Sequence, residues 1–587
     1  MNNMPSAKRT KTHKESYRLA NTLTYRNSFN KSHNVNVMLG QEINHAQNDN
    51  TFMSAKLFPV SVTAEAALEN FALGTPNQST SYKSAPDRTA SFFGRALYDY
   101  KNRYYATLTV RADGSTKFAP GKQWGYFPAG SIAWRISNEK WMKPIKFISD
   151  LKLRASYGLA GNNRIGNDLW HNIYRVYSGT SAPAFGNEEY NYYQFADQTY
   201  LYDPDLKWET TITRNIGLDF GFFRNRLSGT VDVYWNTTKD LLVPSIIPNS
   251  SGYSRQMTNV GQTSNKGVEI SLDAKIIQTK DFQLSANFNV AFNKNKVDKL
   301  ATGETEWKTK ASLSNWYGTY NYKMEVGKSM GLIYGFVNDG FYKVDDFDFD
   351  ATTKKWTLKP GIPDNSSFSS GNFAFKPGAM KFKKLSDSES NLITEDDMTV
   401  IGDTNPKVTG GFGLSGNWKN LDFTAFFNYM CDFDVLNVNK LYLHSAVRRN
   451  YSNLSTDMNL ANRFRYVDDA GVNVSSDPVA LAALNENAKT YSWMSVTQGI
   501  TMTDLVEDGS FLRLSTLTVG YTLPKHWLRS LGVKSLRLYF SGSNLFTITG
   551  YSGYDPEVNI QKGLTPGIDN NVTPRSRVYT VGVNLNF

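Results

Sequence analysis

The sequence predicts an all-β protein, and three observations support this fold class. The chain has 587 residues, of which only 40% are hydrophobic although 14% are aromatic and 43 are glycine, a composition atypical of helical bundles and α/β enzymes. It contains no run of about 18 apolar residues that would form a transmembrane helix. Many segments instead alternate apolar and polar residues with a period of two. Together these features favour a transmembrane antiparallel β-barrel.

The alternation is clearest in residues 282–292, where Phe282, Leu284 and Phe288 are separated by polar residues such as Gln283. Successive side chains of a strand point to opposite faces, so this segment has one apolar face and one polar face. Such segments run for about 11–15 residues, whereas strands of soluble proteins usually have about 5–6. A strand tilted across a bilayer needs about 9–11 residues in the hydrocarbon, which fits these segments better.

Fifteen strands are expected along the chain. Their ranges are 16–27, 32–45, 88–100, 103–111, 123–136, 150–160, 206–221, 225–238, 266–277, 281–293, 407–418, 420–431, 509–521, 533–546 and 575–587. The last range ends in an amphipathic strand, in which Tyr579, Val581, Val583, Leu585 and Phe587 share one face. A strand of this kind ending on an aromatic residue is typical of the last strand of a membrane barrel.

Short and long connections alternate between these strands, which is the pattern of an outer-membrane barrel with periplasmic turns and extracellular loops. The short turns include Lys101–Asn102 and Phe222–Arg224. The long loops are 46–87, 162–205, 239–265, 294–406, 432–508 and 547–574. Consistent orientation requires an even number of spanning strands in 294–406, and we expect none. The strand-like motif GLIYGFVNDGFYK at 331–343 is therefore interpreted as a hairpin that does not span.

The first residues are expected to differ from the rest. Residues 1–15 are predicted to be a disordered or non-native tail, and residues 16–587 to be part of the barrel. The start MNNMPSAKRTKTHKE has no apolar core of a signal peptide, so we expect the chain to begin inside a longer protein. The net charge is +11, but the basic residues are dispersed, which favours a solvated surface over a nucleic-acid site. The single cysteine, Cys431, excludes a disulfide framework and a cysteine-based zinc site.

Ten motifs occur in the order found in one family of membrane proteins. They include RADGSTKF (111–118), WGYFPAGSIAWRIS (124–137), LKLRASYGLAGN (151–162), NKGVEISL (265–272) and IGDTNPKVTGGFG (401–413). The C-terminal part adds DGSFLRLSTLTVGYTLP (508–524) and YSGYDPEV (551–558). In this order the motifs resemble the SusC/RagA family of TonB-dependent outer-membrane transporters from Bacteroidota. We expect the charged residues of these motifs to lie where water reaches them.

The resemblance implies a 22-stranded barrel of which about 15 strands are present here, with the N-terminal plug domain absent. It further implies a truncated or split C-terminal portion of a transporter in the cell outer membrane. Such a transporter would import a nutrient actively, most readily an oligosaccharide or glycan and in some members a peptide. The implied partners are a SusD-like surface lipoprotein, the TonB–ExbB–ExbD complex acting through the plug, and outer-membrane lipid. No nucleic-acid partner is expected.

One segment departs from the family pattern. Members usually carry an acidic loop similar to a calcium-binding loop before the IGD motif. This chain instead reads PGAMKFKKLSDSESNLITEDD at 377–397, with Lys383 and Lys384 where acids would favour a metal. We expect no metal here, although the acids of the segment remain an alternative ligand set: Asp387, Glu389, Asp396 and Asp397.

The sequence offers no catalytic motif. None of the six histidines forms an HExxH pair, and neither GxSxG nor a phosphate-binding loop is present. We therefore expect no enzyme activity, no cofactor, no catalytic residue and no metal. Aromatic residues that gather in the predicted extracellular loops are the candidate substrate contacts, although packing within the loops would also explain them: Trp170, His171, Tyr190, Tyr192, Tyr193, Trp316, Tyr317 and Tyr320.

Two other functional classes stay open at this stage. A passive porin or an adhesin-type barrel would also present long amphipathic strands, but it would need closure without a plug. An outer-membrane hydrolase would need a nucleophile or an acidic site that the sequence does not show.

Overall fold

The structure is a computed structural model that describes residues 5–177, 193–196, 199–301, 303–311, 313, 320–368, 375–444, 453–493, 499–529, 532–557 and 563–587. It divides into two units, each described by itself below. Unit 1 comprises Met1–Asp219 and Tyr234–Thr263, and unit 2 comprises Phe220–Val233 and Ser264–Phe587. Strand β12 (Leu227–Lys239) is divided between the two.

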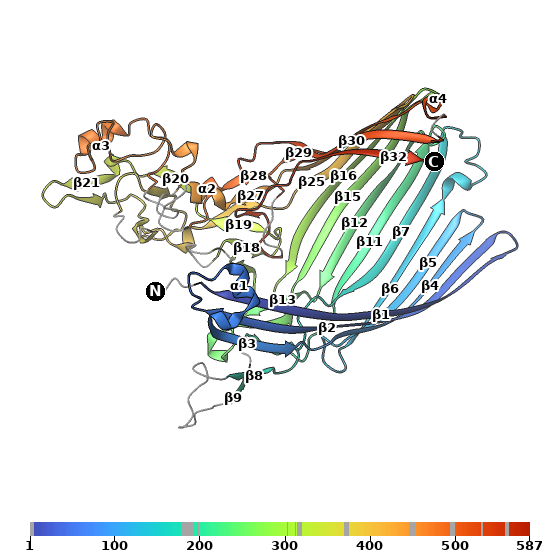
Figure 1. The fold of residues 1–587 in the computed structure, drawn as a ribbon, viewed down its shortest axis with the longest axis horizontal. Helices are drawn as coiled ribbons and strands as arrows, with labels where there is room; N and C mark the ends of the chain where they lie inside the picture. Colours follow the sequence, from blue (N-terminus) through green and yellow to red (C-terminus); the bar gives the residue numbers. More distant parts are fainter. Residues whose placement is uncertain are drawn as a thin grey trace. The chain divides into compact units, whose positions relative to one another are not determined.

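Unit 1 contains a row of long antiparallel strands, coloured blue to green in Figure 1. In spatial order they are β1 (Ala7–Phe29), β2 (His33–Lys56), β4 (Asp87–Tyr100), β5 (Tyr104–Ser115), β6 (Trp124–Arg135), β7 (Ile148–Asn162) and β11 (Glu209–Phe222). The turns that join β1 to β2 and β4 to β5 are tight. In the second of these, Lys101 and Asn102 adopt positive φ angles of 53° and 51°, as two-residue hairpin turns require.

The beginning of the chain differs from the predicted tail over residues 1–15. Residues 7–15 belong to β1, because each is paired with β2 in a ladder that runs from Ala7↔Ala55 to Phe29↔His33. Ala7 and Ala55 are also buried in a small apolar cluster with Phe58. This pairing is non-local, so the basic composition of the segment gave no sign of it.

The other elements of unit 1 are short and lie in its long connections. They are α1 (Ala64–Glu69), β3 (Thr75–Lys83), β8 (Tyr174–Tyr177), β9 (Tyr193–Ala196), β10 (Tyr200–Leu201), β13 (Leu242–Ile246) and β14 (Arg255–Asn259), with 3₁₀ turns at Phe71–Leu73, Ile136–Asn138 and Asn249–Ser251. Thr63 caps α1 by accepting a hydrogen bond from the Ala66 N–H. A small core of Phe118, Ile165, Leu169, Leu206 and Met257 holds several of these connections together.

Unit 2 contains a second row of long antiparallel strands. In spatial order they are β15 (Gln262–Gln278), β16 (Phe282–Lys299), β25 (Val408–Trp418), β26 (Leu421–Cys431), β29 (Phe511–Thr522), β30 (Ser535–Thr549) and β32 (Val578–Asn586). With β12, the long strands of the two units coincide with the fifteen ranges expected from the sequence. The described residues form no closed barrel: β1 is paired only with β2, and β32 only with β30.

The three long connections of unit 2 fold into what we call the loop domain, made from residues 300–407, 432–510 and 550–577. Its strands and helices are β17 (Glu306–Thr309), β18 (Tyr322–Glu325), β19 (Leu332–Gly335), β20 (Asn338–Phe341), β21 (Phe347–Asp350), β22 (Lys355–Leu358), β23 (Met380–Phe382), β24 (Thr399–Asp403), β27 (Asp434–Asn437), α2 (Val438–Leu443), α3 (Pro478–Leu484), β28 (Val506–Asp508) and β31 (Ile568–Asp569). The hairpin expected over 331–343 supplies β19 and β20, and both belong to small sheets separate from the long strands. A further helix, α4 (Lys525–Leu528), lies in the connection between β29 and β30.

All three connections contribute to one apolar core of the loop domain. Ile333 and Leu436 are fully buried there, together with Ile568. Leu436 and Ile568 are neighbours in the parallel pairing of β27 with β31. Tyr322 donates a hydrogen bond of 2.6 Å to the carbonyl of Pro566, which joins the first connection to the third. The loops are thus a folded body with its own interior.

The long strands have one apolar face that is exposed. In unit 2 the register places Val519 beside Phe540 and Phe540 beside Val581, and these three side chains are 36%, 39% and 82% exposed. In unit 1, Leu108 and Ile132 are likewise exposed on adjacent strands. Within the described residues, no helix combines the length and the apolar character needed to cross a membrane.

Candidate functional site

The polar face of the long strands in unit 1 carries a series of ion pairs. Arg135 binds Asp150 through two hydrogen bonds of 2.9 Å, and Ser137 donates a third to the same carboxylate. Arg154 Nε donates to Asp219 Oδ1 at 2.9 Å. These paired charges alternate along each strand with the exposed apolar residues of the other face, so water is the natural solvent of this side.

The same polar face continues in both directions along the sheets. Arg111 binds Asp113 at 2.8 Å on β5, and in unit 2 Arg537 Nε binds Asp422 Oδ2 at 2.8 Å across β30 and β26. Bidentate pairing of guanidinium with carboxylate fixes both side chains against the wall. The result is a wettable wall whose charges are largely compensated.

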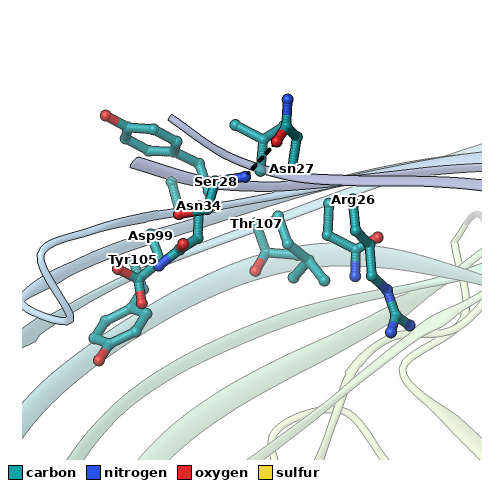
Figure 2. Close-up of a pocket in the computed structure, with 12 residues that line it drawn as sticks. Arg26, Asn27, Ser28, Asn34, Asp99, Tyr105 and Thr107 are labelled. Atoms are coloured by element: carbon teal, nitrogen blue, oxygen red, sulfur yellow. Dashed lines mark hydrogen bonds between the residues drawn. The ribbon is translucent and has the colours of Figure 1, made fainter. Parts of the chain in front are cut away.

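A pocket of about 490 Å³ lies near the short turns of unit 1. Figure 2 shows its lining, which comes from β1, β2, β4 and β5 and includes Arg26, Asp99, Tyr105 and Thr107. Asp99 Oδ1 also accepts a hydrogen bond of 2.8 Å from the Asn102 N–H and thereby stabilises the tight turn. The pocket therefore combines a carboxylate, a guanidinium and an aromatic ring on a rigid hairpin.

Trp170 and His171, two of the predicted contact residues, lie together in unit 1. Their rings meet edge to face, with centroids 4.5 Å apart and an interplanar angle of 80°. His171 Nε2 is 3.3 Å from Asp168 Oδ1, and the preceding Leu169 is buried in the small core of the unit. The buried indole Nε1 of Trp170 has no hydrogen-bond partner among the described residues. The backbone is thus anchored beneath two half-buried rings.

The other predicted contact residues are placed as follows. Tyr320 is half-buried in unit 2, next to the buried Asn321, whose Nδ2 donates to Thr501 Oγ1 at 2.8 Å. Tyr193 is the first residue of β9 in unit 1. The remaining four lie outside the described residues: Tyr190, Tyr192, Trp316 and Tyr317.

The acidic segment over 377–397 is organised around a lysine. Asp397 is fully buried, and its carboxylate accepts hydrogen bonds from the backbone N–H groups of Leu385, Ser386 and Thr394. Lys384 Nζ lies 3.1 Å from Asp397 Oδ2 and also donates to Ser386 Oγ and to the Leu392 carbonyl. Burial opposes ionisation of Asp397, but these hydrogen bonds hold its pKa well below the usual range.

The ammonium of Lys384 thus occupies the place among these oxygens that a metal ion would take. Of the acids considered as an alternative ligand set, Asp397 is committed to the contacts just described. No group of three or more His, Cys, Asp and Glu side chains in the described part of the chain is arranged to hold a metal ion. The segment therefore carries its own cation.

A buried ion network in unit 2 was missed by sequence reasoning. Arg513, in the motif DGSFLRL, was expected to contact water, but its side chain is only 2% exposed. It binds Asp555 at 2.5 Å and Glu557 at 3.1 Å, and Arg575 binds Glu557 at 2.9 Å. The correction has a simple cause, because residues 550–557 fold over this end of β29 and cover the guanidinium. The YDPE sequence at 554–557 was the available signal, since it supplies two acids to a strand arginine.

Comparison with known proteins places these features in a family. A family model described as TonB dependent receptor-like, beta-barrel, matches residues 3–545. The chain is 32% identical over 573 residues to TonB-dependent receptor P3 of Formosa agariphila, covering 97% of this chain and 52% of that protein. It is 31% identical over 509 residues to TonB-dependent receptor SusC of Bacteroides thetaiotaomicron, covering 85% and 43%.

Solved structures give the same result. The structure of the RagAB peptide transporter matches with a TM-score of 0.74 at 25% identity, covering 99% of this chain and 56% of that chain. The chain spans about half the length of the relatives it matches. These relatives are receptors and transporters rather than enzymes. The chain belongs to the TonB-dependent receptor β-barrel family and is of the SusC/RagA type.

Proposed function

We propose that this chain supplies wall strands and a surface loop domain to an outer-membrane transporter that imports a nutrient with energy from TonB. The observation that carries the proposal is the two-faced character of the long strands. Their apolar face is exposed, as at Val581, while their polar face bears compensated ion pairs such as Arg135–Asp150. This arrangement fits a wall with hydrocarbon outside and water inside.

The unpaired edges of β1 and β32 support a wall with more strands than are described here. A free strand edge leaves backbone N–H and C=O groups unpaired, which is costly in hydrocarbon. We infer that these strands form part of a 22-stranded barrel. In this proposal a plug domain within the barrel transmits energy from the TonB–ExbB–ExbD complex.

An oligosaccharide is the cargo we propose first, and a peptide second. The matched relative SusC and the RagAB peptide transporter bear these names themselves. In this chain the edge-to-face pair of Trp170 and His171 offers an aromatic face for sugar C–H groups, and the unpartnered indole N–H offers a donor for a hydroxyl or carbonyl. We further propose that a SusD-like lipoprotein covers the loop domain from outside.

Fractionation of cells that express the full-length transporter tests the membrane assignment. We expect recovery in the outer membrane, and recovery in the soluble periplasm would contradict the proposal. Uptake of labelled oligosaccharides and peptides with Trp170→Ala then tests the contact site. We expect this variant to lower uptake, whereas Trp141→Ala, at an exposed tryptophan of the connection between β6 and β7, should leave it unchanged. Unaltered uptake in Trp170→Ala would remove this residue from the site.

A further inference from the structure

The exposed apolar face of unit 1 contains a groove of about 680 Å³ across β4, β5, β6, β7, β11 and β12. Its floor consists of small residues, and its walls consist of large ones. The register places Tyr98 beside Ala106, Ala106 beside Ile132, and Ile132 beside Ala155. Large and small side chains therefore alternate from strand to strand, which hollows the surface between them.

The adjacent row on the same face has the complementary order. Ala96 is beside Leu108, Leu108 beside Gly130, and Gly130 beside Tyr157. Each small residue of one row thus lies diagonally next to a small residue of the other, and the depressions join into one oblique channel. A chain of methylene groups lying in it would be in contact with side chains on both flanks, which a flat wall does not allow.

A single arginine lies at one end of the groove. Arg214 is on the same face of β11 as Ile216, which is 49% exposed, and it lines the groove together with Trp235. Its Nη1 donates to the Trp235 carbonyl at 3.5 Å and to Thr237 Oγ1 at 3.3 Å, and its guanidinium is 6.0 Å from the centre of the Tyr157 ring. No carboxylate among the described residues lies within ion-pair distance of it.

The position of Arg214 along β11 gives its depth. From Ile216 to the end of the strand, alternate residues on this face are all apolar, whereas in the other direction the face carries Ile212 and then Thr210. On β12 the apolar series ends at Trp235, whose carbonyl Arg214 contacts, and a threonine and a lysine follow on the same face. Arg214 therefore lies close to the edge of the apolar band on the side of the long connections, one step inside its last apolar residue on β11. Tyrosine and tryptophan beside it are typical of the membrane interface.

We propose that this groove is a binding site for a phosphorylated acyl lipid of the outer leaflet, with one acyl chain in the channel and the phosphate at Arg214. A guanidinium near the edge of hydrocarbon without an acidic partner favours an anion, and its planar fork pairs well with phosphate. The Tyr157 and Trp235 rings flank the headgroup. The inference rests on the proposed function, because it takes the exposed apolar face to be the lipid-facing one.

Lipid retention by the full-length protein tests this site. The protein is purified from outer membranes in mild detergent, stripped of lipid, and incubated with equal amounts of phosphatidylglycerol and phosphatidylcholine of the same acyl chains. Native mass spectrometry then counts the lipids that remain bound. We expect the wild-type protein to retain phosphatidylglycerol in preference to phosphatidylcholine. In Arg214→Gln this preference should fall roughly tenfold, the change expected when one charge-assisted contact is lost.

Two further variants separate the headgroup from the channel. Gly130→Leu fills the floor of the groove, and the backbone tolerates it because a Cβ at this position meets only the Thr107 carbonyl, at 3.5 Å. We expect it to weaken retention of both lipids. Lys280→Gln removes a positive charge from the short turn after β15 and should change neither. Heat-modified gel mobility of each variant establishes that it is folded.

The outcomes distinguish this inference from the proposed function. Recovery of the protein in the soluble fraction would overturn both. Recovery in the outer membrane with no bound lipid, with equal retention of the two lipids, or with an unchanged preference in Arg214→Gln would overturn the lipid site alone. Loss of the preference in Arg214→Gln, with Lys280→Gln unaffected, would support it.

Discussion

Unit 2 contains two regions that treat apolar side chains in opposite ways. On β32 the apolar residues are exposed, with Val581 82% and Val583 58% accessible. In the loop domain, which is made from the connections between such strands, Ile333 and Leu436 are completely buried. Burial of apolar surface from water is favourable by about 25 cal/mol per Å², so this difference reflects two solvents rather than two chain chemistries. The loop domain is built for water and the strand face for hydrocarbon.

The same contrast holds for charges. The strand walls pair arginine and carboxylate on the polar face only, whereas the loop domain buries charged groups when a full set of partners is available, as for Asp397. Arg513 stands where the two regions meet, on β29 but beneath residues of the loop domain. Substitutions at these positions show how far each region depends on its own solvent.

The largest effect is expected at Arg513. Replacement by methionine leaves the 5%-exposed Asp555 and the adjacent Glu557 without their cation. Breaking a buried ion network by removing one partner costs about 3–5 kcal/mol. We expect protease cleavage within 550–577 to accelerate strongly. Lys407→Met is the matched control, because its partner Asp432 and Lys407 itself are about two-thirds exposed, and it should cost less than about 1 kcal/mol. Equal cleavage in both variants would contradict the burial argument.

Reversal of one apolar position on β32 is expected to have the next largest effect. Val581→Arg places a charge on the face assigned to hydrocarbon, which costs about 2–4 kcal/mol at mid-membrane depth. The measurement is the urea concentration at which the protein unfolds in lipid vesicles, followed by gel mobility. Thr580→Arg, on the opposite face of the same strand, should have little effect. If the two substitutions were equally tolerated, the assignment of the faces would be wrong.

Removal of the internal cation of the loop domain should have an intermediate effect. In Lys384→Met the buried carboxylate of Asp397 keeps its backbone hydrogen bonds but loses its ammonium. A hydrogen bond to a charged group contributes about 1.5–3 kcal/mol, so faster hydrogen exchange is expected over 385–397. Added calcium should slow this exchange again if the vacated oxygens accept a metal. Lys383→Met, at the neighbouring lysine, is the control and should leave exchange in this segment unchanged.

The smallest effect concerns acid sensitivity of the loop domain. Burial lowers the pKa of His444 to about 4, and nearby Lys440 lowers it further, while Asp457 and Glu507 oppose the shift. Its Nδ1 pairs with the Tyr491 hydroxyl at 3.0 Å. Between pH 6.5 and about 4 the unfolded state binds a proton that the folded state does not. Stability should therefore fall as the pH falls through this window, by at most about 1.4 kcal/mol per pH unit, and be unaffected above it.

Hydrogen exchange of α2 at pH 7.5 and pH 5 measures this dependence. His444→Gln should flatten the pH profile, whereas His526→Gln, at the exposed helix α4, should leave it as in the wild type. A profile that keeps its slope in His444→Gln would show that another group is responsible.

The sequence predicted the long strands because their signal is local. Period-two alternation and tight turns such as Lys101–Asn102 depend only on neighbouring residues, so the fifteen ranges could be found without coordinates. The loop domain could not be predicted in the same way. Its β27 pairs with β31 from a different connection, and Phe336 is bridged to Met502. Such contacts join residues that are far apart in the sequence and carry no periodic pattern.

The candidate site was predicted in part for the same reason. Trp170 and His171 are adjacent in the chain, so their pairing needed no long-range information. The partner of Asp397 lies thirteen residues away at Lys384, and the acids that bind Arg513 lie more than forty residues away. Composition indicated acids and lysines in the right segments but could not show which of them meet.

The shared interior of the loop domain has a consequence for chimeras between related transporters. Exchange of one connection alone would join two half-cores that were shaped by different partners, so Leu436 or Ile568 would face an unmatched surface. Swapping residues 300–407, 432–510 and 550–577 as a set keeps the native complement together. Selectivity should therefore be inherited by these three segments jointly, as one cassette, and recombination that separates them should yield misfolded receptors.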